Sequence, residues 1–349
     1  MESSGLQNAL SSLQKSLETT PEMFSRLNFL LSTMGVCLTS IHIIVLSTIR
    51  SSSTNMIIFG LSICEMLVMM TTVGKYFAEV ERDNPNCIAS DSYASVYVEI
   101  AVWSLQDYLR MCSTWLGVVL AVLRSCILQF IMNSKFDRLS RPIYGTSLSL
   151  LTLFSLAIPS AFAFCRFKVD QNLTPKPECV KLNEMAVKPQ FVLSVRDLFT
   201  ENDGFVMNAC QIVDAFFSKF IPSILFLIFA IVLLFELRRA RENRDSVSES
   251  PKGDLSSKTV TVITCSFLIT ESPFGILQYM YYTSNGTMSL PPSVASVSVV
   301  LHTLNSILHP LFCFSLSPRY RHAFFRFFGI IEDNKPKASM ISVSSMRTK

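Results

Sequence analysis

Long runs of apolar residues alternate along the chain with short polar segments. Each run reaches the roughly 17–25 mostly apolar residues that a helix needs to cross a bilayer. The third and fifth runs exceed the bilayer thickness, so we expect these helices to tilt or to project into water. The pattern predicts an all-α fold, a seven-transmembrane helix bundle, with spans at about Leu27–Ile49, Asn55–Tyr76, Tyr97–Phe130, Ile143–Cys165, Val206–Leu237, Val260–Tyr282 and Val294–Leu316.

A short basic segment rich in phenylalanine follows the last apolar run without a break. It contains Phe324, Phe325, Phe327 and Phe328 beside Arg319, Arg321 and Arg326. Arginines on one side of a helix and phenylalanines on the other predict an amphipathic interfacial helix. We therefore expect an extracellular tail over residues 1–26, a seven-transmembrane domain over 27–317, the amphipathic helix over 318–329 and a cytoplasmic tail over 330–349.

The composition supports a membrane protein. Half of the residues are apolar and 16% are charged, whereas a soluble domain carries about 25% charged residues. The net charge of +4 is too small to indicate a nucleic-acid partner. The expected surroundings of the chain are therefore those of the lipid bilayer.

The distribution of basic residues between the loops predicts the orientation. Most of the Lys and Arg residues lie in Arg50–Thr54, Asn133–Pro142, Arg238–Lys258 and the C-terminal tail. Cytoplasmic loops carry such an excess, although the opposite loop Arg166–Arg196 is basic too. We expect a multi-pass protein of the plasma membrane with its N-terminus outside and its C-terminus in the cytoplasm.

Two sequons and two cysteines fall in the loops that this orientation places outside. Asn172 and Asn285 each begin an Asn-x-Thr sequence, which predicts glycosylation. Cys87 and Cys179 lie in different outside loops, where oxidation is allowed, so we expect a disulfide between them. Cys165 is the competing partner.

Ionisable and polar residues inside the spans are functional candidates, and the alternative is that they satisfy one another. The set is Glu65, Gln106, Asp107, Arg110, Arg124, Asp214, Lys219, Glu271, His302, Asn305 and His309. Arg110 cannot lose its proton and needs an acid nearby, which Glu271 or Glu65 can supply. One hypothesis is an Arg110–Glu271 ion pair.

Among the prolines within predicted spans are Pro222, Pro273 and Pro310. Each frees a backbone carbonyl and bends its helix. Kinked helices around a polar centre suit a hinge-like rearrangement.

The motifs of several other classes are missing from the sequence. It has neither HExxH, GxSxG nor paired CxxC motifs, so we expect no enzyme, no cofactor and no metal site. The seventh span has no Lys, which excludes a retinal Schiff base there. A channel or transporter would need a continuous polar path or repeated broken helices, whereas the polar residues here form an outer bowl and a central cluster.

Four segments carry a resemblance to a known family. They are CSTWLGVVLAVLR (Cys112–Arg124), FDRLSRP (Phe136–Pro142), ESPFG (Glu271–Gly275) and NSILHPLFCFSLSPRYR (Asn305–Arg321). Across essentially its whole length the chain resembles a rhodopsin-like G-protein-coupled receptor. More narrowly, it is similar to the nematode class-w serpentine receptors, which group with FMRFamide-type and myosuppressin-type neuropeptide receptors.

The resemblance implies roles for the residues of the inner and central bundle. Arg124 matches the arginine that meets the G protein, and Glu65 the acid that can bind sodium, with Ser113 and Asn305 as its neighbours. Glu271 takes the place of an aromatic residue that switches during activation. The implied coupling and activation set is Arg124, Pro222, Phe267, Pro273, Asn305, His309 and Pro310.

Several positions depart from the family pattern. Leu123 stands where an acid usually precedes Arg124, His309 stands where Asn precedes the proline, and Cys313 stands where a tyrosine follows it. These departures keep open a seven-span protein that does not signal.

A bowl between the helices is the expected ligand site. The candidate residues are Trp103, Gln106, Asp107, Arg110, Asp214, Glu271, Tyr279, Tyr282 and His302. The resemblance implies an amidated, FMRFamide-like neuropeptide, whose guanidinium would pair with carboxylates; the alternative is a chemosensory receptor for a small molecule. The implied partners are this ligand and a heterotrimeric G protein, with arrestin as a further candidate. Gln106 takes the place of the amine-binding acid, so an aminergic receptor is not expected.

Overall fold

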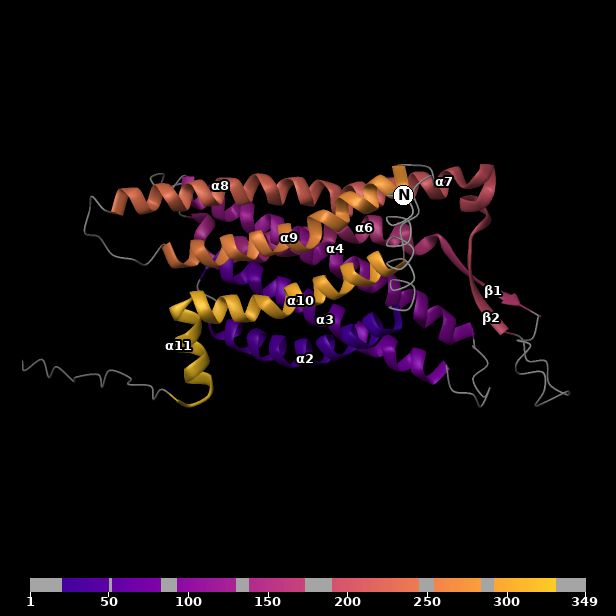
Figure 1. Cartoon of the computed structure of the whole chain (residues 1–349), viewed down its shortest axis with the longest axis horizontal. Helices are drawn as coiled ribbons and strands as arrows, with labels where there is room; N and C mark the ends of the chain where they lie inside the picture. Colours follow the sequence, from indigo (N-terminus) through magenta and orange to yellow (C-terminus); the bar gives the residue numbers. More distant parts are fainter. Residues whose placement is uncertain are drawn as a thin grey trace, which may run out of the picture.

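The computed structural model of the chain describes residues 21–49, 52–82, 93–129, 138–172, 190–244, 254–283 and 292–330. Its long helices run lengthwise beside one another, and a short helix crosses one end of the bundle (Figure 1). The long helices are α2 (Pro21–Thr48), α3 (Ser53–Arg82), α4 (Tyr93–Gln129), α6 (Pro142–Cys165), α7 (Asp197–Ala215) with η2 (Phe216–Phe220) and α8 (Ile221–Arg244), α9 (Asp254–Thr283) and α10 (Pro292–Leu316). In this part of the chain seven helices are long and apolar enough to cross a membrane, which confirms the predicted bundle.

The first helix begins earlier than predicted, at Pro21 instead of Leu27. A proline fits the first turn of a helix, where its missing N–H costs nothing. Glu22 adds a negative charge near the positive end of the helix dipole, and it also accepts a hydrogen bond of 2.6 Å from Arg26. The six residues from Pro21 to Arg26 therefore belong to the helix instead of the tail.

The fifth span is a single rod that contains a π turn at Phe216–Phe220. Pro222 lies just after this turn and has no N–H to offer the carbonyl of Ser218. A wider turn absorbs such a break in the hydrogen-bond register. The rod continues on both sides of the turn as α7 and α8.

Helix α4 lies in the interior, and α6 lies at the periphery. Of the most apolar stretch of each helix, 61% is buried in α4 and 6% in α6. The exposed face of α6 presents Leu151, Phe154 and Ile158, as expected of a surface that meets lipid. Gly145 lets α6 approach α3, because a side chain there would meet the backbone of Ser53.

The short helix α11 (Pro318–Phe327) forms where the amphipathic segment was predicted. Ser317 caps it by accepting a hydrogen bond of 3.3 Å from the Tyr320 amide. It ends before Gly329, whose φ of 70° suits a residue without a side chain. The helix is therefore two residues shorter than predicted.

A two-stranded antiparallel hairpin adds to the helical fold, and the sequence did not predict it. Strand β1 (Phe167–Asn172) pairs with β2 (Gln190–Val195), with Phe167 opposite Val195. Lys168 forms ion pairs with Asp170 at 3.3 Å and with Asp197 at 2.9 Å. The hairpin extends from the end of the bundle opposite α11 (Figure 1).

Candidate functional site

Two adjoining cavities lie between the helices at the hairpin end of the bundle. The first has a volume of about 360 Å³ and lies among α2, α3, α4 and α10. The second has a volume of about 600 Å³ and lies among α4, α6, η2, α9 and α10. Trp103, Asp107, Arg110 and Val299 border both. Both volumes fall in the range of roughly 300–1,000 Å³ that is typical of small-molecule sites.

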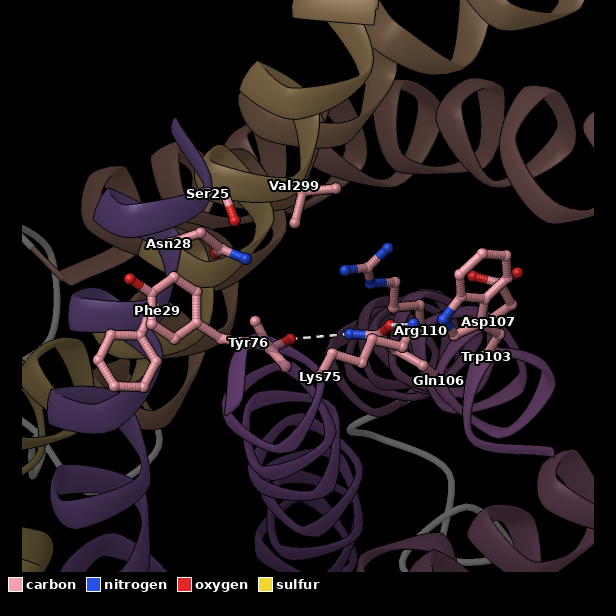
Figure 2. A pocket seen from close by; sticks show the side chains of 11 residues that line it. Ser25, Asn28, Phe29, Lys75, Tyr76, Trp103, Gln106, Asp107, Arg110 and Val299 are labelled. Atoms are coloured by element: carbon pink, nitrogen blue, oxygen red, sulfur yellow. Dashed lines mark hydrogen bonds between the residues drawn. The ribbon is translucent and has the colours of Figure 1, made fainter. Parts of the chain in front are cut away.

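The first cavity has a polar floor and aromatic walls. Figure 2 shows Lys75, Gln106 and Arg110 around the same space. Lys75 donates a hydrogen bond to the side-chain oxygen of Gln106, and Gln106 donates one of 2.7 Å to Thr72. The Lys75 ammonium also lies 5.3 Å from the ring centre of Trp103, close enough for a cation–π contact.

Arg110 projects from α4 between the two cavities. Its Nε is buried without a hydrogen-bond partner among the described residues. The hypothesis of an Arg110–Glu271 ion pair is wrong, because Glu271 pairs with Lys219 and His302 instead. The partner of an intramembrane arginine depends on how the helices rotate, which the sequence does not state.

The Glu271 carboxylate holds together three elements below the second cavity. Nδ1 of His302, on α10, lies 2.6 Å from one of its oxygens. The ammonium of Lys219, in the π turn, lies 3.3 Å from the other. Because a carboxylate only accepts, His302 donates through Nδ1. A buried carboxylate needs such partners, and Lys219 also lines the second cavity, so a ligand there can reach this network.

A packed aromatic pair lies deeper in the bundle than Glu271. Phe267 stacks on Phe226 with ring centres 5.1 Å apart and planes 4° from parallel. The Phe267 ring also lies 5.0 Å from the ring of His309. His309 Nδ1 lies 3.0 Å from an oxygen of Glu65, and both side chains are 1% exposed. The predicted activation residues Phe267 and His309 are therefore in contact.

The predicted sodium-site residues lie around this central pair. Ser113 is fully buried and donates to the backbone oxygen of Arg110 at 3.0 Å. Asn305 is fully buried, and neither of its side-chain polar atoms has a partner within the described part of the chain. His309 already contacts the Glu65 carboxylate that would bind sodium. The described residues contain no cluster of three or more His, Cys, Asp or Glu that could hold a metal ion. The sodium site stays a prediction.

Arg124 lies at the other end of α4, where its side chain is buried. It follows Trp103 by 21 positions, which places the two about 32 Å apart along the helix. A signal from the cavities to Arg124 must therefore pass through the bundle. Pro273 follows Glu271 in α9 and Pro310 follows His309 in α10, so each proline adjoins one of the buried histidine–glutamate contacts.

Of the remaining predicted ligand residues, one lines a cavity and another packs elsewhere. Asp214 borders the second cavity. Tyr279 instead packs on Phe220, with ring centres 4.6 Å apart, and its neighbour Tyr281 lines the cavity. The structure does not describe the side chain of Tyr282.

The predicted extracellular modifications fall mostly outside the described residues. Cys87, Cys179 and Asn285 lie there, and so does the side chain of Asn172, the last residue of β1. The competing cysteine, Cys165, is a free thiol, as are the other described cysteines.

Sequence reasoning missed several cavity residues, above all Lys75 and Phe29. Lys75 ends a predicted span, where a lysine normally points to water. Its spacing of three from Thr72, on the same helix face, was the available signal. Lys219 is an intramembrane candidate from the sequence, and only the structure places it at the second cavity.

The comparison with protein families agrees with the fold. Residues 26–331 match the family described as "Serpentine type 7TM GPCR chemoreceptor Srw". This confirms the resemblance to class-w serpentine receptors, whereas nothing in the match supports the neuropeptide receptors. A search of curated proteins found no match. A receptor of this kind is normally not an enzyme, and it acts through an extracellular ligand and a G protein. The chain belongs to the Srw family of serpentine seven-transmembrane G-protein-coupled chemoreceptors.

Proposed function

We propose that the chain is a chemosensory receptor whose small-molecule ligand binds in the two cavities and activates a heterotrimeric G protein. One observation carries this proposal: the second cavity reaches Lys219, and Lys219 also holds Glu271. A ligand in the cavity therefore meets a charge network that joins the π turn, α9 and α10.

The proposed mechanism starts with competition for Lys219. A ligand that contacts the Lys219 ammonium weakens its pairing with Glu271, and this α9 side chain then loses one of its two charged or polar partners. Pro273 lies two residues further along α9, where its missing N–H weakens the helix. The ligand drives this change only as far as it prefers the rearranged state.

The change reaches the inner end through packed side chains. Phe267 lies one turn below Glu271 and contacts both Phe226 and His309. A displacement of α9 therefore disturbs the stack and the His309–Glu65 pair. In this proposal the inner end of α4, with Arg124, then meets the G protein, and arrestin is a further partner there.

The proposed orientation places the cavities outside and α11 at the cytoplasmic face. Helix α11 carries Arg319, Arg321 and Arg326 beside exposed Phe327, which suits the interface of an anionic inner leaflet. The tail beyond it then lies in the cytoplasm.

An amidated peptide is the second candidate ligand. Asp107 and Asp214 border the second cavity, and carboxylates pair well with a peptide guanidinium. Within the described residues the β1–β2 hairpin pairs with no further strand, so a peptide strand can add to its edge. The small molecule is favoured because Glu271, an acid among the candidate ligand residues, already has two partners and because the family consists of chemoreceptors.

The test is G-protein activation in cells that express the chain, challenged with a small-molecule library and with amidated Arg-Phe peptides. Ser298→Trp fills the second cavity, and Leu151→Trp on the exposed face of α6 is its matched control. We expect a saturable response to a small molecule that Ser298→Trp and Arg124→Ala abolish and Leu151→Trp preserves. A response to peptides alone, or one that Ser298→Trp leaves intact at equal surface expression, contradicts the proposal.

A further inference from the structure

We infer that the first cavity binds the carboxylate of an acidic small molecule, held between Arg110 and Lys75. The inference rests on the proposed function, since it takes the ligand to be a small molecule, and it adds the chemical class of that ligand. It reverses the charge expected from an Arg-Phe-amide peptide.

The side chains that line the first cavity carry more positive than negative charge. Its ionisable side chains, apart from Tyr76, are Lys75, Arg110 and Asp107, two cations against one acid. Lys75 donates a hydrogen bond to the side-chain oxygen of Gln106, which is neutral. Two further carboxylates attract these cations, Glu99 acting on Lys75 and Glu271 on Arg110, but neither lines the cavity.

The second cavity differs in this respect. Lys219 is neutralised there by Glu271. Its other charged side chains are two arginines, Arg110 and Arg166, and two acids, Asp107 and Asp214. Arg110 and Asp107 border both cavities, so Lys75 is the cation that distinguishes the first cavity from the second.

An anion is the occupant that complements the two cations lining this cavity. The Arg110 guanidinium cannot lose its proton, and its planar donors match the two oxygens of a carboxylate. Its Nε is already buried without a partner among the described residues, which is costly for a charged group. A cationic ligand would instead meet repulsion from Lys75 and Arg110.

The cavity walls define the rest of the ligand. Phe29 and Tyr76 stack with ring centres 4.2 Å apart, and Trp103 stands on the other side beneath the Lys75 ammonium. These rings suit a flat or aliphatic body. The volume of about 360 Å³ suits a monocarboxylic acid, and a longer chain can pass Arg110 into the second cavity.

The test measures binding to the purified full-length chain without a G protein. The probes are phenylacetate, 3-phenylpropanoate, hexanoate and decanoate, with 3-phenylpropanamide and 3-phenylpropylamine as neutral and cationic matches. We expect only acids to raise the thermal unfolding midpoint. Arg110→Gln should weaken the best acid roughly 10- to 100-fold, and Lys75→Gln should weaken it less.

Lys168→Gln removes a cation at the same end of the bundle but outside both cavities, so it should leave acid binding unchanged. Equal stabilisation by the amide or the amine, no stabilisation by any of the acids, or unchanged affinity in Lys75→Gln overturns the inference. Lys75→Gln decides alone if Arg110→Gln does not fold. Acid binding without any signalling would instead refute the receptor function and leave the site standing. Signalling by neutral small molecules without acid binding would do the reverse.

Discussion

Replacing Glu271 and Lys219 separately and together tests whether their ion pair stabilises the fold. The two charged atoms lie 3.3 Å apart, and the side chains are 6% and 24% exposed. At an effective dielectric constant of 20 the attraction at this distance is about 5 kcal/mol. Desolvation of both groups offsets much of it, so we expect a coupling free energy of about 1–3 kcal/mol.

The assay compares the thermal unfolding midpoints of the purified chain and of Glu271→Gln, Lys219→Met and the double variant. Each single change leaves a charged or polar partner unpaired, so each should lower the midpoint. The double variant should melt higher than the sum of the single effects predicts. Its control combines Lys219→Met with Glu22→Gln, an exposed carboxylate at the start of α2, and there the effects should add.

Additive effects of Glu271→Gln and Lys219→Met would refute the pairing. A separate result addresses the mechanism: if the pair restrains α9, Glu271→Gln should raise the basal G-protein signal at equal surface expression. An unchanged basal signal with strong coupling would keep the ion pair and reject its role as a restraint.

Three further predictions concern other parts of the molecule. Tyr320→Phe removes the 2.7 Å hydrogen bond to His42 and should cost about 1 kcal/mol, read as faster hydrogen exchange in α11; unchanged exchange would contradict it. In Gly117→Ala the new methyl carbon would lie 3.0 Å from the Phe267 ring, so the thermal midpoint should fall, by about 1–3 kcal/mol of stability; an unchanged midpoint would show that the ring yields freely. The Ser194 hydroxyl, on β2, donates a hydrogen bond of 2.5 Å to Asp170. This bond holds the pKa of the Asp170 carboxyl below its usual range. The stabilisation of the hairpin by this hydrogen bond is therefore full above the unfolded pKa, about 4, and is lost as the pH falls through the lower folded pKa. The protection factors of the β1 amides against hydrogen exchange should fall over the same pH range, and Asp170→Asn should remove this pH dependence.

The sequence was sufficient for the bundle because bilayer thickness imposes a length on every span. The same physics explains what it left open. Whether Lys75, at the end of a predicted span, points to water or into the bundle depends on helix rotation, which packing decides. The β1 sequence FKVDQN has too little alternation between apolar and polar residues to indicate a strand.

The central polar residues illustrate a different limit. Their presence inside spans was evident, but the choice of partners was not. Arg110 and Glu271 looked complementary by charge, whereas the fold gives Glu271 a histidine and a lysine. Only the relative depth and rotation of α4, α9 and α10 decide between these pairings.

Helix α10 contacts both of the acids that are buried in the described part of the chain. His302 pairs with Glu271 of α9, and His309 pairs with Glu65 of α3. The two histidines are seven positions apart, which places them on one face of α10 and about 10 Å apart along it. Asn305 lies between them, fully buried. A rotation of α10 as a whole moves both histidines relative to their acids, because both lie on one face of the same helix. A ligand that acts at Lys219 and Glu271 therefore needs no contact with Glu65 to change the pairing at the centre of the bundle.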